Sequence, residues 1–485
     1  MRISSPFGVP SLALLNLFAW IRRQWWLQAL YRLLPLSLRQ DMLKRVSAAT
    51  HAKLLFSRSD TWPSGISPAG ACPAALHADP AATRRQTGAV NLFGYMRGQF
   101  GLAESARLYA RALLACDATV SIVDIDIDLP HGWDDRSLDA HIGNEAPHDI
   151  SIVFVNPDYL DAALEKIGRK RIEGHYIIGC WFWELEQIPR EWIPHLGAVD
   201  EVMVASEFVE RAFRKVTSKP ILRVPLPLIA PADSGLARLD FDLPDEAFVF
   251  LCAFDFHSWL ERKNPLAVMK AFMKAFPPER DDVVLLVKTS NGHRYPEKLR
   301  GLLNAAAVDR RIMVRDQVID ASHMQALQRC CDAYVSLHRA EGFGLGLAEC
   351  MAIGKPVIAT AWSGNMEFMN TENSRLVDYT LVPVLEGQYP HAVGAVWAEA
   401  NTDTAAAHML ELATFRSSAA ELGERGRRAV LAALAPEHAG ECLIRRCVEI
   451  EGLRDRLRRG SPHMADMGKI GAATGDEGWE PCSHS

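Results

Sequence analysis

The sequence lacks the cysteine spacing that marks metal and redox motifs. Ten cysteines are scattered over 485 residues, and no two of them form a Cys-x-x-Cys arrangement. The common zinc and dithiol motifs are therefore excluded, and the pattern is typical of reduced, buried thiols in a cytoplasmic protein. A net positive charge is also missing, since the formal charge is −6. The chain as a whole therefore does not resemble a nucleic-acid-binding protein.

A membrane-spanning run is likewise absent from the N-terminal region. Residues 3–21 are uncharged but include Ser, Pro, Gly and Asn, and their helical core is too short to cross about 30 Å of hydrocarbon. A secretory signal does not fit, because the basic residues mainly follow the apolar run and no clear small-x-small cleavage site appears.

The same region is strongly basic. Residues 1–58 hold nine Lys or Arg against one Asp, a local charge of +8 that leaves −14 for the remainder. Tryptophans accompany these cations, as in Trp25-Trp26. The pattern predicts a basic amphipathic helical extension on an anionic membrane surface. The alternative is a helical extension that packs on the body of the protein.

The most informative stretch is glycine-rich and follows a predicted buried strand at Ala333–Leu337. Its glycines let the backbone approach a ligand closely, and a helix predicted to begin near Leu345 directs its unpaired N–H groups toward that point. Glu341 and Glu349 flank the turn, and carboxylates can accept hydrogen bonds from sugar hydroxyls. A nucleotide sugar would satisfy both features. The alternative is a plain turn with two solvated glutamates.

These residues carry a resemblance to a known family. The chain reads Glu-Gly-Phe-Gly-x-x-x-x-Glu from Glu341 to Glu349, and then Gly-Lys-Pro-Val-Ile-Ala-Thr up to Thr360. It resembles the bacterial retaining glycosyltransferases of family 4 (group 1), which have the GT-B fold, from about Val90 to Leu457. The resemblance implies an α/β protein in which two Rossmann-like domains face one another across a cleft, here with an N-terminal helical extension.

The same resemblance implies a function. A hexose would move from GDP-mannose or a UDP-sugar to a glycan or lipid-linked acceptor, with no bound metal and no other cofactor. Such reactions build surface polysaccharides or glycolipids, so the protein is expected in the cytoplasm or at the inner face of the cytoplasmic membrane. The competing hypotheses are a catalytically silent binding or scaffold protein of the same fold and a GT-B epimerase or phosphorylase.

The family motifs also imply roles for single residues. Glu341 would lie beside the donor sugar and Glu349 on the ribose, while Lys263 and Arg262 would stabilise the leaving diphosphate. The arginine of the family usually lies several residues earlier, where this chain has Ser258. The remaining donor-binding candidates are Gly342, Phe343, Gly344, Leu345, Lys288 and Asn365. For Lys288, a solvated position is an equal alternative.

Acceptor-side candidates come from the first predicted domain. Gly98 and Gly101 form a second glycine turn before a helix, and Trp183-Glu184 follows a predicted strand. Many family members have a histidine near the latter position, and an aromatic cluster at the sheet edge is the alternative for Trp183. Asp124-Ile-Asp-Ile-Asp128 could suggest a metal site of the GT-A type. We reject that interpretation because the aspartates alternate at a strand end.

The chain is predicted to divide into six segments. A parallel sheet in each Rossmann-like domain is expected from short apolar runs that alternate with helical stretches. The segments are the basic helical extension 1–58, a linker 59–88, an acceptor domain 89–232, a nucleotide-sugar domain 233–436, a crossover helix 437–459 and a disordered tail 460–485.

Overall fold

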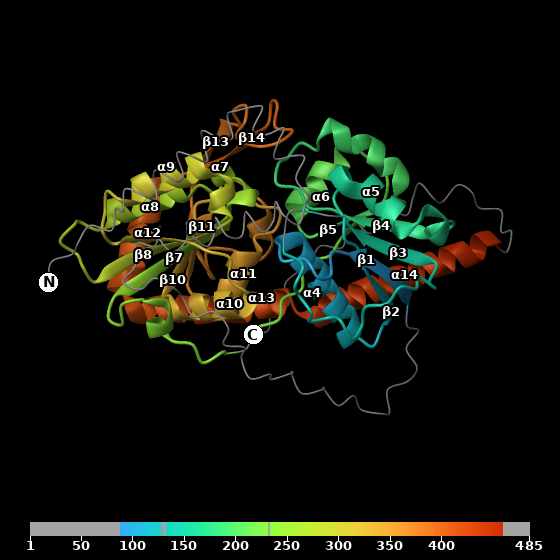
Figure 1. Cartoon of the computed structure of the whole chain (residues 1–485), viewed down its shortest axis with the longest axis horizontal. Helices are drawn as coiled ribbons and strands as arrows, with labels where there is room; N and C mark the ends of the chain where they lie inside the picture. Colours follow the sequence, from blue (N-terminus) through green and yellow to red (C-terminus); the bar gives the residue numbers. More distant parts are fainter. Residues whose placement is uncertain (1–87, 128, 130–131, 231–232, 459–485) are drawn as a thin grey trace, which may run out of the picture.

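The computed structural model describes residues 88–458 except 128, 130–131 and 231–232. The predicted basic extension, nearly all of the predicted linker and the predicted tail therefore lie outside the described residues. Within the described residues, two sheets with flanking helices lie side by side (Figure 1). The predicted α/β class is confirmed.

The first sheet has six parallel strands in the order β2-β1-β3-β4-β5-β6. Its central strands are apolar and buried, because helices cover both faces of a parallel sheet. The strands are β1 (Ala89–Gly94), β2 (Thr119–Asp124), β3 (Ile150–Phe154), β4 (Tyr176–Cys180), β5 (Glu201–Val204) and β6 (Ile221–Arg223). The helices beside them are α4 (Gly101–Ala115), α5 (Pro157–Ile167) and α6 (Glu207–Arg214).

The second sheet also has six parallel strands, in the order β12-β11-β10-β7-β8-β9. Read from the other edge, this is the strand order of a dinucleotide-binding Rossmann fold, and the order reverses between β7 and β10. The strands are β7 (Phe248–Asp255), β8 (Val283–Ser290), β9 (Ile312–Asp316), β10 (Ala333–Ser336), β11 (Val357–Thr360) and β12 (Arg375–Val377). The helices are α7 (Leu260–Lys263), α8 (Pro265–Ala275), α9 (Pro296–Ala306), α10 (Ala321–Cys330), α11 (Leu345–Ala352), α12 (Thr402–Thr414) and α13 (Arg416–Ala433).

An antiparallel hairpin extends from the second sheet toward the first domain (Figure 1). It consists of β13 (Tyr379–Pro383) and β14 (Val396–Ala400). We call residues 379–400 the arm. Buried arm side chains, among them Tyr389 and Trp397, belong to the same hydrophobic cluster as residues of the first domain. The arm therefore packs against both domains.

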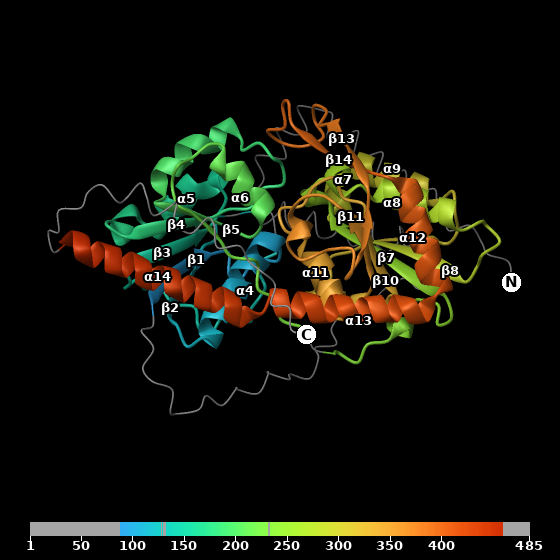
Figure 2. The same cartoon turned by 180° about the vertical axis from the view of Figure 1, so that it is seen from behind.

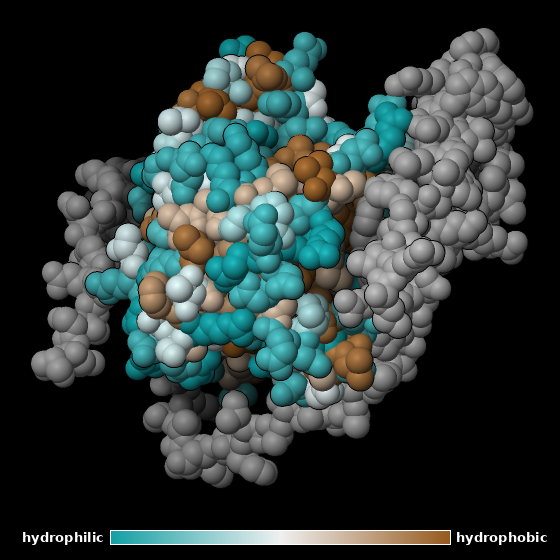
Figure 3. Space-filling model, turned by 90° about the vertical axis from the view of Figure 1, so that its left-hand side faces the viewer, coloured by the Kyte–Doolittle hydropathy of each residue, from teal (hydrophilic) through white to brown (hydrophobic). Residues whose placement is uncertain are grey.

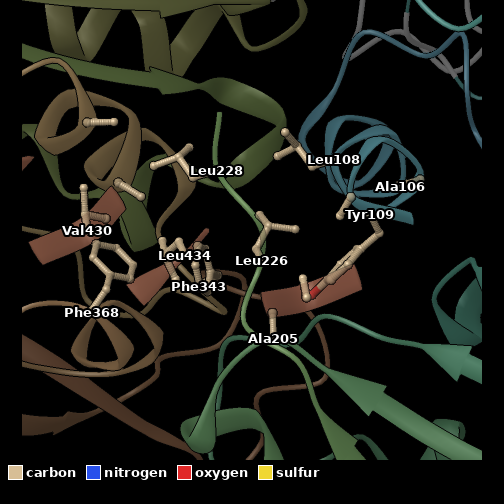
Figure 4. Close-up of a cluster of buried hydrophobic side chains, with 14 of the residues drawn as sticks. Ala106, Leu108, Tyr109, Ala205, Leu226, Leu228, Phe343, Phe368, Val430 and Leu434 are labelled. Carbon is tan, nitrogen blue, oxygen red and sulfur yellow. The ribbon is translucent and has the colours of Figure 1, made fainter. Parts of the chain in front are cut away.

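A long C-terminal helix also joins the two domains. Helix α14 (Pro436–Arg458) follows α13 and runs along the first domain beside α4 (Figure 2). At the junction, Leu228 N–H donates to the Leu434 carbonyl at 2.8 Å. One hydrophobic cluster continues through this region, with Leu226 and Leu228 between helix α4 on one side and Phe343 and Leu434 on the other (Figure 4).

The surface of the second domain is mainly hydrophilic where it is visible in Figure 3, with apolar residues scattered or in small groups. Among the described residues, no helix combines the length and the hydropathy that crossing a membrane requires. The eight cysteines in this part of the chain are free thiols, and six of them are buried.

Candidate functional site

The candidate site is centred on Glu341, five residues beyond the end of β10. Its carboxylate accepts a short hydrogen bond from Lys263 Nζ and a second one from Arg262 Nη1 at 3.0 Å. Arg262 and Glu341 are buried side chains, with 5% and 10% of their surface exposed, whereas Lys263 retains 21%. Lys263 is thus the cation of this group that solvent, or a ligand, reaches most easily.

The fold accounts for this meeting of distant residues. Strands β7 and β10 are neighbours in the sheet, and their loops carry Lys263 and Glu341. The strand order reverses between them, and open α/β sheets bind ligands at the carboxyl ends of strands at such a switch point. The Arg339 N–H donates to the Arg262 carbonyl at 2.7 Å and ties the two loops together.

Local backbone geometry places Lys263 at a helix junction. Asn264 has φ +50°, a left-handed conformation that asparagine tolerates, and this ends α7. Pro265 then occupies the first turn of α8, where its missing N–H costs no hydrogen bond. Lys263 therefore lies beside the N-terminus of α8, as the sequence predicts.

The positive charges around Glu341 strongly lower its pKa. Burial by itself raises the pKa of Glu341, but the positive charges of Lys263 and Arg262 outweigh it and hold the pKa at about 2. Burial also tends to lower the pKa of Arg262, yet Glu341 and Glu184 keep it above its usual value. Glu341 is therefore a permanent anion at neutral pH, and Arg262 a permanent cation.

The glycine turn after Glu341 needs its glycines for close approach. Gly344 has φ +96° and caps the N-terminus of α11. A Cβ on Gly364, in the loop after β11, would stand 2.2 Å from the Gly342 carbonyl oxygen, so the two loops are in direct backbone contact. The first N–H groups of a helix have no partner within it, and a helix N-terminus favours negative charge. Phe343 and Leu345 lie in the same turn, with the Phe343 ring buried.

Glu349 lies in the second turn of α11 and is partly buried. Its Oε2 accepts a hydrogen bond of 3.2 Å from Nε2 of Gln328 on α10. Burial raises the pKa of Glu349 to about 7, because no cation compensates the lost hydration as Lys263 does for Glu341. The two glutamates of one motif therefore titrate about 5 pKa units apart.

A buried histidine that the sequence analysis did not single out connects the loops after β10 and β11. His338 Nε2 lies 3.0 Å from Asn365 Oδ1 and 3.3 Å from the Trp362 carbonyl. Both partners are acceptors, so the proton is assigned to Nε2. Burial lowers the pKa of His338, which keeps the ring neutral. The sequence signal that could have pointed to His338 is its position just after strand β10. Asn365 is fully buried in this contact, so its side chain connects the loop after β11 to the loop after β10.

The first domain contributes a carboxylate to the same group. Glu184 follows β4, and its Oε1 lies 3.8 Å from Arg262 Nη2. Tyr389 of the arm donates its hydroxyl to Glu184 Oε2 at 2.6 Å. The Arg262 guanidinium also lies over the Tyr389 ring, 6.0 Å from its centroid. Arg262 thus connects Glu341, the first domain and the arm.

Trp183 lies next to Glu184 but faces the interior. Only 4% of its surface is exposed, and its ring contacts Trp192 and Tyr389 at centroid distances of 4.8 and 5.6 Å. This favours the aromatic-cluster alternative for the ring. Its backbone oxygen lies 3.0 Å from where a Cβ on Gly342 would stand. The two domains therefore touch at the glycine turn, where Ser206 Oγ also donates to the Gly342 carbonyl at 2.7 Å.

Three other predicted residues make their contacts with groups other than Glu341. The solvated position considered for Lys288 is wrong, because the side chain is buried and its Nζ donates to the carbonyls of Thr289 and Gln317 at 2.8 and 2.6 Å. Gly98 is buried beneath the rings of Phe100 and Trp133, while Gly101 is exposed at the start of α4.

Asp124, part of the acidic run that begins at the end of β2, pairs with an arginine. Asp124 accepts hydrogen bonds from Arg97 N–H and Arg97 Nη1 at 3.2 and 3.3 Å, and Asp128 lies outside the described residues. No cluster of acidic, histidine or cysteine side chains suited to a metal ion occurs in the described part of the chain.

Comparisons with known proteins define the class of this architecture. Sucrose-phosphate synthase from Thermosynechococcus elongatus aligns over 77% of this chain and 100% of its own, with 16% identity and a TM-score of 0.54. HepE from Anabaena, solved in complex with UDP and glucose, aligns over 74% and 100%, with 14% identity and a TM-score of 0.54. The described domains have the GT-B fold of these glycosyltransferases.

A family model identifies the second domain more closely. Residues 247–384, from β7 to the arm, match the family described as glycosyl transferases group 1. No match was found among curated proteins. The chain therefore carries a group 1 glycosyltransferase domain, which contains Lys263, Glu341 and Glu349. Membership of family 4 and a bacterial source stay predictions.

Proposed function

We propose that the protein is a retaining glycosyltransferase that moves a hexose from a nucleoside-diphosphate sugar to a glycan or lipid-linked acceptor. The observation that carries the proposal is the contact of Lys263 with Glu341 at the switch point of the second sheet. The N-terminus of α11 lies directly after the same turn. An ammonium group and a helix N-terminus suit a diphosphate, and a permanent carboxylate suits sugar hydroxyls.

The contacts of Arg262 and Lys263 support different roles for the two cations. Arg262 already donates from Nε to the Ser258 carbonyl and from Nη1 to the Ala340 carbonyl and Glu341. We assign Arg262 to holding Glu341 in place. The more exposed Lys263 is assigned to the leaving diphosphate, whose charge grows as the bond to the sugar breaks. Such fixed charges stabilise a transition state without reorganising during the reaction.

In the proposed reaction, the bond between the anomeric carbon and the diphosphate oxygen breaks. The acceptor hydroxyl attacks the anomeric carbon on the face that the diphosphate leaves, and its proton passes to the departing phosphate oxygen. Atoms and charges balance without a further reactant. Glu341 would hold the sugar hydroxyls and Glu349 the ribose hydroxyls during this step. HepE, solved with UDP and glucose, shows that a protein of the same fold binds such ligands.

A lipid-linked acceptor is the part of the proposal that rests on residues 1–58. The +8 charge and the tryptophans of that segment support peripheral attachment to the anionic inner face of the cytoplasmic membrane. A reaction at this surface would give the enzyme access to acceptors that are held in the bilayer, as surface polysaccharide or glycolipid synthesis requires.

A thermal-shift screen tests the proposal. GDP-mannose, UDP-glucose, UDP-GlcNAc and the free diphosphates are added to the full chain, and a good ligand at about 100 times its Kd stabilises by about 2.7 kcal/mol. We expect a rise of several degrees in Tm with at least one nucleotide and a smaller rise in Lys263→Ala. Lys274→Ala is the matched control, because Lys274 pairs with Asp403 at the surface. A Tm unaffected by every nucleotide would contradict the proposal.

A further inference from the structure

Ser363 has a backbone conformation that serine rarely adopts. It lies in the loop after β11, with φ +80° and ψ −149°. This region is essentially reserved for glycine, and residues with a Cβ there are strained unless their surroundings fix them. Ser363 is buried, with 6% of its surface exposed. Strain of this kind concentrates at functional sites, where the surrounding contacts enforce it.

The Ser363 side chain makes a contact that glycine could not make. Its Oγ accepts a hydrogen bond of 2.8 Å from the backbone N–H of Glu341, and it donates a short one to the Trp362 carbonyl. The next residue, Gly364, donates its N–H to the Glu341 carbonyl at 2.9 Å. The loop after β11 therefore satisfies both backbone polar groups of Glu341. The carboxylate of Glu341 is held separately, by Lys263 and Arg262.

We propose that Ser363 is a positioning residue that fixes the backbone of Glu341, and that its unfavourable conformation is retained because the hydroxyl supplies this acceptor. The inference rests on the proposed glycosyl transfer and deepens it, since Glu341 is the residue placed beside the donor sugar. A glycine at this position would relieve the strain but leave the buried Glu341 N–H without its acceptor. Ser363 would then act on turnover through Glu341 and not through the diphosphate.

Two substitutions separate the effect of the backbone strain at Ser363 from the effect of its hydroxyl group. Ser363→Ala keeps the strained Cβ and loses Oγ, whereas Ser363→Gly loses both. We expect kcat for nucleotide-sugar hydrolysis or transfer to fall about 10- to 100-fold in both variants, because a misplacement of about 1 Å in the groups that position a substrate can have effects of this size. Binding of UDP or GDP should stay within about twofold of the wild type, since neither contains the sugar. Ser363→Gly should melt about 3 °C above Ser363→Ala, because only the glycine variant relieves the strain.

The measurement uses the full chain with UDP-glucose or GDP-mannose, whichever the wild type turns over, and follows kcat, KM and Tm. Ser374→Ala is the control, because Ser374 is also buried but donates its hydroxyl to the Asn370 carbonyl. It should lower Tm and leave kcat unchanged. We expect Ser363→Gly to combine a higher Tm than Ser363→Ala with a low kcat. Loss of a merely structural hydrogen bond would not produce this combination.

The same measurements distinguish a failure of the proposed glycosyl transfer from a failure of the positioning role of Ser363. A wild type that turns over no nucleotide sugar would overturn the proposed function. An active wild type with a fully active Ser363→Gly variant would overturn only the positioning role, because glycine would then serve as well as serine. If Ser363→Ala does not fold, the glycine variant alone decides, since it carries no strain of its own at this φ.

Discussion

Glu349 is expected to make the affinity for a nucleotide sugar depend on pH. A ribose-binding carboxylate accepts hydrogen bonds from hydroxyl groups, and it does so best when ionised. Because burial raises the pKa of Glu349 to about 7, the ionised fraction grows from about one tenth at pH 6 to about nine tenths at pH 8. We therefore expect the association constant to rise about tenfold over this range, which corresponds to about 1.4 kcal/mol.

Calorimetric titration of the full chain at pH 6, 7 and 8 measures this dependence. A nucleotide sugar is the right probe, because its phosphates are both esterified and do not titrate near neutrality. Glu349→Gln should bind with nearly the same affinity at all three pH values, because its amide carries no titrating proton. Glu372→Gln, at an exposed position, should keep the dependence of the wild type. A wild-type affinity that does not change with pH would refute the assigned role of Glu349. So would a Glu349→Gln variant whose affinity changes with pH as much as that of the wild type.

The same ionisation has a consequence for stability. The folded-state pKa of about 7 lies above the ordinary value of 4.5, so the folded protein binds this proton more tightly than the unfolded chain. The resulting stability is fully present below about pH 4.5 and is lost as the pH rises through about 7. Glu349→Gln should therefore gain stability relative to the wild type between pH 5 and pH 8, by about 1–3 kcal/mol at the upper end. Melting curves at both pH values check the sign.

Three further predictions follow from the site and the sequence. Lys263→Ala should lower kcat about 100- to 1,000-fold, with a smaller change in KM, because charge on the leaving group is greatest in the transition state; a raised KM with kcat untouched would refute the leaving-group role. Transfer should persist in excess EDTA, and strict Mg²⁺ dependence would restore the metal interpretation of Asp124–Asp128. Full-length protein should bind anionic vesicles at low salt and bind them less well at high salt, whereas protein truncated to residues 86–485 should lose this binding and keep turnover of a soluble donor. Full-length protein that ignores such vesicles would leave residues 1–58 as a packed extension.

The sequence predicts the parallel sheets and the centre of the site because both depend on local patterns. Apolar runs of strand length alternate with helical stretches, and parallel strands bring their carboxyl ends to one edge. This rule places the loops of Lys263 and Glu341 at the same edge of the second sheet, although 78 positions separate the two residues in the chain; their direct contact is a finding of the structure. The start of α11 at Leu345 follows equally from the glycine turn.

The contacts between the domains could not be predicted in this way. Glu184 and Tyr389 are 205 positions apart, and no periodicity connects a strand end in one domain with the arm of the other. The burial of Trp183 could not be predicted from the sequence for the same reason, because an aromatic residue after a strand can contact either a ligand or a neighbouring hairpin. The strain at Ser363 left no signal either, because Ser-Gly after a strand is an ordinary turn sequence.

Release of nucleoside diphosphate by the purified full chain tests the central claim most directly. The protein is incubated with each candidate nucleotide sugar, with and without a glycan or lipid-linked acceptor, and the diphosphate is quantified beside Lys263→Ala and the control Lys274→Ala. The account predicts release from at least one donor by the wild type and the control, and a loss of about 100-fold or more in Lys263→Ala. Release from no donor, or equal release by Lys263→Ala, would contradict it.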